Sequence, residues 1–195
     1  MNRFTPLLAV CVLALTAVRI AAADDKPAGF RADLLGQIEY AQKQILDLEN
    51  AIPQDKMAWR PNKDVRSISE VYSHIAFGNY FLAKFAGIEP PAGITFSSES
   101  DGTKWEKATT DKKEIADQLV KSFTFVKDAI GKMSDADLEK HTTFFGQDMT
   151  ARGMLLTMLS HMHEHLGQSI AYARMNNIVP PWTAAQQAAE AKAKK

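Results

Sequence analysis

Residues 150–177 have the sequence TARGMLLTMLSHMHEHLGQSIAYARMNN, in which apolar residues recur at intervals of three and four. This spacing is typical of one face of an α-helix, and Thr150 is a suitable N-cap for a helix that ends near Asn177. That face contains Met154, Met158, His161, His165, Gln168 and Tyr172. Two histidines therefore lie where the sequence predicts a buried face.

Three more helices are predicted upstream of this stretch. Residues 27–53 have a stripe that is limited by a proline, and residues 67–87 open with the S-x-x-E pattern of a capping box and end at a glycine. Residues 111–131 have a third stripe behind an acidic cap. The stripe of residues 27–53 consists of Leu34, Ile38, Ala41, Ile45, Leu48 and Ile52. Because strand-like alternation is confined to a brief extended piece at residues 142–147, the predicted class is an all-α four-helix bundle.

The segments outside the four predicted helices also have recognisable sequence patterns. Residues 1–23 combine a basic start, an apolar run and small residues before Asp24, and this order predicts a secretory signal peptide. We expect an exported protein, periplasmic or extracellular, whose bundle domain covers residues 24–182. Residues 87–110 are expected to be a long irregular connection, and residues 183–195 a mobile Ala/Lys-rich tail.

Composition limits the function. The 195 residues are 46% hydrophobic and 24% charged, which is ordinary for a globular domain. Lys+Arg and Asp+Glu number 23 each, so no basic surplus predicts binding to nucleic acid. The single cysteine, Cys11, lies in the predicted signal peptide, which excludes thiol nucleophiles and thiolate ligands from the mature chain. We expect that the protein is not stably inserted in a membrane once the signal peptide is cleaved. We expect its partner to be a small molecule. Whether the protein forms a homodimer is left open.

The histidines indicate metal chemistry. His161 and His165 lie about 40° apart around a helix and about 6 Å apart along it, so both can approach one ion, whereas His163 points away. His74 has an inward position on the helix of residues 67–87 and can complete a three-nitrogen site. One divalent metal ion, zinc, nickel or iron, is the expected cofactor. His141 and His163 are expected to be dispensable, and Gln168 to line the site.

Two alternatives compete with this interpretation. A single histidine on an apolar face is more often a hydrogen-bonded core residue than a ligand, but three unpartnered imidazoles would be costly to bury. The run His161 to His165 also superficially suggests the alternating histidines of a zinc hydrolase loop, yet its flanks keep a helical period and it is not H-E-x-x-H. Glu164, Glu70 and Tyr72 are candidates for a general base only because they are near histidines in sequence.

The chain resembles the DinB-like (DinB/YfiT-like) family of four-helix-bundle metalloproteins over nearly its whole mature length. The resemblance rests on residues 59–61 (WRP), 65–76 (VRSISEVYSHIA), 161–174 (HMHEHLGQSIAYAR) and 179–182 (VPPW). It implies one metal-binding histidine on the second helix and two on the last, which match His74, His161 and His165. It also implies an up-down-down-up bundle, with the long connection as the crossover between the second and third helices.

The predicted histidine site is compatible with three classes of function. Three histidine ligands leave coordination positions open, which favours a metal-dependent enzyme with hydrolase-like chemistry on an unidentified small molecule. The alternatives are a non-catalytic metal- or ligand-binding bundle, and a thiol-transferase-like enzyme, since some members of the family transfer low-molecular-weight thiols. Export would separate this chain from cytosolic thiol cofactors.

Overall fold

The computed structural model describes residues 27–96 and 99–194. The predicted signal peptide lies outside the described residues. The elements are α1 (Gly29–Ala51), a 3-10 turn (Gln54–Lys56), α2 (Ile68–Phe85), α3 (Glu99–Glu106), α4 (Lys112–Lys132), α5 (Asp135–Leu138), β1 (His141–Phe144), β2 (Gln147–Thr150), α6 (Ala151–Met175) and α7 (Pro181–Ala193). The described chain is thus predominantly helical, which confirms the predicted all-α class.

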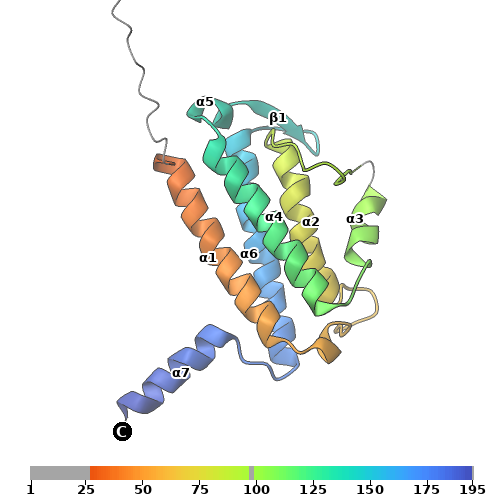
Figure 1. The fold of residues 1–195 in the computed structure, drawn as a ribbon, viewed down its shortest axis with the longest axis vertical. Helices are drawn as coiled ribbons and strands as arrows, with labels where there is room; N and C mark the ends of the chain where they lie inside the picture. Colours follow the sequence, from red (N-terminus) through yellow and green to blue (C-terminus); the bar gives the residue numbers. More distant parts are fainter. Residues whose placement is uncertain (1–26, 97–98, 195) are drawn as a thin grey trace, which may run out of the picture.

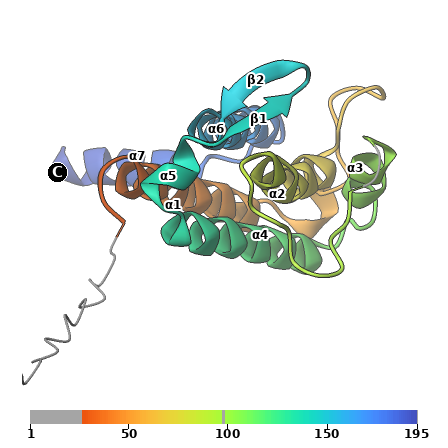
Figure 2. The same ribbon diagram turned by 90° about the horizontal axis from the view of Figure 1, so that it is seen from above.

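Four long helices, α1, α2, α4 and α6, pack side by side around one core (Figure 1). Both α2 and α1 contact α4 and α6, and the view along the bundle shows α3 beside α2 and the β1–β2 hairpin next to α6 (Figure 2). The six residues of the predicted stripe in α1 and its end are all buried, as are Ile115, Leu119, Phe123, Val126 and Ile130 of α4. The 3.6-residue period therefore predicted the core-facing positions of both helices.

The predicted helix starts are confirmed by their caps. Ser67 and Glu70 form a complete capping box at the start of α2. The side chain of Asp111 accepts a hydrogen bond from the backbone N–H of Glu114, and that of Thr150 accepts one from Gly153. These side chains satisfy N–H groups that have no partner within the helix, so each start is defined locally.

The start of α4 lies beside the end of α1. The side chain of Gln54 donates to the carbonyl of Thr110 at 2.8 Å and accepts from the backbone N–H of Lys112 at 2.8 Å. At the other end of the bundle, Arg31 of α1 donates to the carbonyl of Met133, just after α4. α1 and α4 are therefore antiparallel neighbours.

The prediction that residues 87–110 lack a helix is wrong. They contain α3, whose eight residues are too few for a periodic stripe to stand out in sequence. α3 packs against α2 through Gly102, where an added Cβ would lie 3.1 Å from the ring of Phe77. The helix predicted over residues 111–131 is α4, which continues to Lys132.

The brief extended piece predicted at residues 142–147 lies in a two-stranded antiparallel hairpin, in which His141 pairs with Thr150 and Phe144 with Gln147. Its two-residue turn consists of Phe145 and Gly146. Residues 181–193 form α7, which extends away from the bundle and buries none of its residues (Figure 1). None of the helices in the described ranges has the length and apolar content needed to cross a bilayer.

Candidate metal centre

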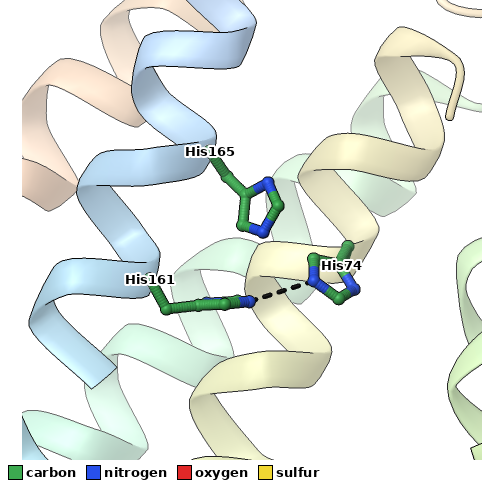
Figure 3. Close-up of side chains that lie close together, drawn as sticks. All are labelled: His74, His161 and His165. Carbon is green, nitrogen blue, oxygen red and sulfur yellow. Dashed lines mark hydrogen bonds between the residues drawn. The ribbon is translucent and has the colours of Figure 1, made fainter. Parts of the chain in front are cut away.

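His74 of α2 meets His161 and His165 of α6 at the seam between the two helices (Figure 3). One ring nitrogen from each histidine lies within 4.8 Å of the others. The Nε2 atoms of His74 and His161 are 3.0 Å apart, and the three ring centroids are 4.5 to 4.9 Å from one another. The structure therefore brings together all three histidines that the sequence singled out.

The local sequence of both helices makes this approach possible. His161 and His165 are one turn apart on α6, so both rings leave the same face. On α2, Gly78 is one turn after His74, and a Cβ atom there would lie only 2.3 Å from Cε1 of His161. Because Gly78 has no side chain, the His161 ring can occupy the space beside it.

His74 is held by a carboxylate from α3. Its Nδ1 lies 2.7 Å from Oε1 of Glu106, a residue that is only 8% exposed. Arg66 donates to both oxygens of the same carboxylate, with Nε 2.8 Å from Oε2 and Nη2 3.1 Å from Oε1. Since a carboxylate only accepts, Nδ1 of His74 carries the proton, and its Nε2 presents a lone pair.

His165 is oriented by its own helix. Its Nδ1 lies 2.8 Å from Oε1 of Gln168, whose Nε2 donates to the hydroxyl of Tyr172 at 3.0 Å. The amide oxygen of Gln168 can only accept, so this contact also places the proton on Nδ1 and leaves Nε2 with a lone pair. Both hydrogen bonds thus prepare the tautomer that a metal ligand requires.

Burial favours the neutral form of the two histidines on α6. Burial, reinforced by the charges of His165, His74 and Arg66, lowers the pKa of His161 to about 3. Burial also lowers the pKa of His165. Burial alone would raise the pKa of Glu106, but the hydrogen bonds and positive charges of His74 and Arg66 lower it to about 2. At neutral pH His161 and His165 are therefore neutral and Glu106 is ionised.

The other two histidines lie elsewhere. His163 is exposed and its Nδ1 donates to the carbonyl of Leu159 at 3.0 Å, whereas His141 is exposed in the hairpin and pairs with Asp148 at 2.8 Å. The predicted separation of His163 from the inward face of α6 agrees with this geometry.

None of the base candidates is well placed. Glu164 is exposed. Glu70 accepts from the backbone of Ser67 and from Arg60 at 3.0 Å, so it serves the cap of α2. Tyr72 is fully buried, and burial raises its pKa well above the ordinary value.

Glu106 and Arg66 are site residues that were not predicted from the sequence. Arg66 precedes the cap of α2 and Glu106 ends α3, 40 residues later, so only the fold brings them together. The one available signal was an acidic residue after Trp105 within the predicted irregular connection, which is too weak to identify a histidine partner.

A cavity of about 320 Å³ leads to the centre. Its lining includes His74 and His161 together with Arg66 and Glu106, and its apolar wall consists of Phe77, Phe81, Leu82, Phe144 and Phe145. The volume is near the lower end of what small-molecule sites have. His74 and His161 can therefore be reached from outside through an aromatic pocket.

Solved structures of low sequence identity share the fold. A DinB-like protein from Bacillus cereus superimposes with a TM-score of 0.64 and 22% identity, over 77% of this chain and 95% of that chain. A DinB-like protein from Bacillus subtilis gives 0.57 and 16%, over 74% and 92%. The mycothiol-dependent maleylpyruvate isomerase gives 0.57 and 11%, over 72% of this chain and 62% of that chain.

Among curated proteins, no sequence matches the chain significantly. The sequence profile of the DinB superfamily, however, matches residues 37–169, which is more than half of the chain and includes all three clustered histidines. The protein therefore belongs to the DinB superfamily.

Proposed function

We propose that the protein binds one divalent metal ion through His74, His161 and His165. The observation that carries this proposal is the convergence of three imidazoles, two of which have Nδ1 engaged by Glu106 and Gln168. A hydrogen bond can join the Nε2 atoms of only two of these histidines, whereas a metal ion can accept a lone pair from each of the three rings. Zinc, nickel and iron all suit this donor set.

The proposed role is that of a metal-dependent enzyme acting on a small molecule. When bound, the ion would supply Lewis-acid polarisation of a substrate oxygen, and hydrolysis is the default chemistry for such a centre. The chain contributes the orientation of the ligands, through Glu106 and Gln168, and an aromatic cavity through which a small molecule can reach the centre. Support for an enzyme, as opposed to a structural centre, comes from this cavity, because a structural site is normally closed by protein.

A second candidate is thiol-dependent chemistry. It is favoured by the shared fold of the maleylpyruvate isomerase, which is mycothiol-dependent. The predicted signal peptide opposes it, because an exported protein would not meet a cytosolic thiol. The third candidate, a non-catalytic metal-binding bundle, is favoured by the lack of a well-placed base among Glu164, Glu70 and Tyr72.

Two further parts of the proposal concern the whole chain. We infer export after cleavage at Ala23 from the order of charge, apolar run and small residues. We also infer the up-down-down-up order of the four long helices, and the antiparallel packing of α1 against α4 supports it.

Elemental analysis of purified variants tests the metal site. The wild type and His163→Ala should each contain one metal ion per chain, and His161→Ala should contain almost none. His163 is the matched control because it lies on the same helix, two residues away, and faces outward. Equal metal loss from both variants, or no metal in the wild type, would refute the assigned ligands.

Cobalt substitution then separates an enzyme from a structural centre. In a site reached through the cavity, azide should shift the visible spectrum of the cobalt protein. A spectrum that azide does not change would indicate a shell closed by protein, and the binding bundle would replace the enzyme.

A further inference from the structure

The turn of the β1–β2 hairpin has an unusual residue. Phe145 and Gly146 form its two-residue loop with φ angles of 47° and 77°. A loop with two positive φ angles favours asparagine or aspartate followed by glycine, because a bulky side chain is strained in the left-handed region. The glycine is the expected residue here, and the phenylalanine is not.

Phe145 makes few packing contacts that could offset this strain. Its side chain is 77% exposed, and its main partner is the neighbouring ring of Phe144, at a centroid distance of 4.4 Å. The strained backbone lowers stability, and a ring that stays exposed contributes little burial energy to offset that cost. Such a combination is found where a side chain serves binding.

Phe145 borders the cavity that leads to His74 and His161. Phe144 lies beside it and contacts Phe85 of α2 at a centroid distance of 5.0 Å. Phe77 and Phe81 of α2 also line the cavity, and their rings stack at a centroid distance of 5.6 Å with 16° between their planes. The hairpin tip and α2 thus give the pocket aromatic surfaces from two elements.

The charges around the centre favour an anion. Arg66 and Glu106 neutralise each other, and a histidine that binds a metal ion does so as a neutral imidazole. A divalent ion at the centre would therefore have no negative protein ligand to balance it. A ligand with an anionic donor group supplies that charge, and its apolar part would meet the phenylalanines.

We propose that the cavity binds an aromatic carboxylate, with the carboxylate at the metal and the ring between α2 and Phe145 at the hairpin tip. The inference rests on the proposed metal site. No bond is formed or broken in this step.

Calorimetric titration of the zinc-loaded protein with phenylacetate and with acetate tests the ligand class. Phenylacetate should bind at least tenfold more tightly than acetate, because only its ring can contact the pocket wall. A protein that takes up no zinc would overturn both proposals. One that takes up zinc but binds the two anions equally would overturn this inference alone.

Two substitutions of Phe145 separate binding from folding. Phe145→Asn and Phe145→Ala both remove the ring, so each should weaken phenylacetate binding about fivefold and leave acetate binding unchanged. Asparagine also suits the left-handed backbone, so only Phe145→Asn should raise the melting temperature of the ligand-free protein, by about 2 to 4 °C. Tyr40→Ala is the control, since Tyr40 is 57% exposed on α1 and lies outside the cavity lining.

The opposite results would overturn the inference. Unchanged phenylacetate affinity in both Phe145 variants would show that the ring does not contact the ligand. If Phe145→Asn instead abolished self-association while phenylacetate affinity stayed the same, the hairpin tip would be an interface between copies of this chain.

Discussion

The faces that α1 and α4 turn to the core differ from the seam between α2 and α6. The first contain side chains such as Ile38, Ile45, Leu119 and Phe123, all fully buried and apolar. The seam contains three histidines, a glycine that makes room for one of them, and a carboxylate supplied from α3.

The difference separates the residues that stabilise the fold from the residues that could bind an ion. The burial of apolar side chains is favourable without any specific hydrogen-bond partner. The α1 and α4 stripes therefore stabilise the fold wherever the helices pack together. Buried imidazoles need hydrogen bonds or a metal, so the seam depends on residues outside both helices. Substitutions in the α1 and α4 stripes should therefore change the stability of the fold, whereas substitutions at the seam should change metal binding.

The largest effect is expected from the apolar side. Phe123→Ala should lower the free energy of unfolding by about 3–5 kcal/mol, because it removes a fully buried ring and leaves a cavity. Urea unfolding followed by circular dichroism measures this. Metal content per folded chain should stay at the wild-type value, and a selective loss of metal would break the proposed separation.

Removal of the metal should have the next largest effect, and it should act only through the seam. An ion present at about 100 times its dissociation constant stabilises the folded state by about 2.7 kcal/mol, so chelation should lower the melting temperature by several degrees. His161→Ala should show no shift with chelator. A wild-type melting temperature that is insensitive to chelation would argue against a metal in the seam.

Glu106→Gln should sharpen the comparison by weakening the seam without touching a ligand. The amide can still accept from Nδ1 of His74, but it loses the charge and part of the pairing with Arg66. Loss of such a partner typically costs 10 to 100-fold in metal affinity, on the order of 1.4 to 2.8 kcal/mol. Competition with a chromophoric chelator measures it.

Asp148→Asn is the matched control for Glu106→Gln. Asp148 pairs with His141 at 2.8 Å on the exposed hairpin, so the same chemical change occurs away from the centre. Equal losses of affinity in the two variants would mean that Glu106 acts through general charge rather than through His74.

The smallest expected effect is a pH dependence of the metal-free protein. The folded pKa of His161, about 3, is below its unfolded value of 6.5, so the unfolded state binds more protons between these values. Stability is therefore fully present above pH 6.5 and declines as pH falls toward 3, by less than about 1 kcal/mol per histidine between pH 7 and pH 6.

Unfolding of the apo protein at a series of pH values tests this sign, and His161→Gln is the control, since it should show a shallower decline. Stability that increased on acidification from pH 7 to pH 6 would contradict the burial of neutral rings at the seam.

Sequence reasoning succeeded where the signal is local. Ser67, Asp111 and Thr150 are caps that act within three residues, and the spacing of His161 and His165 follows from one helical turn. It failed where contacts are distant along the chain. α3 is stabilised by packing on α2 and not by its own periodicity, and the pairing of Glu106 with His74 spans 32 residues.

The separation of His74 and His161 along the chain, 87 residues, has a consequence for metal uptake. In the unfolded polypeptide the closest histidines are His161, His163 and His165, and this local trio can chelate an ion without closing a long loop, whose entropy cost is about 4 to 5 kcal/mol for nearly 100 residues. Winding of α6 turns His163 outward and breaks that trio. On the proposed ligand set, an ion that the unfolded chain had bound through this trio would therefore have to pass from His163 to His74 as α2 docks.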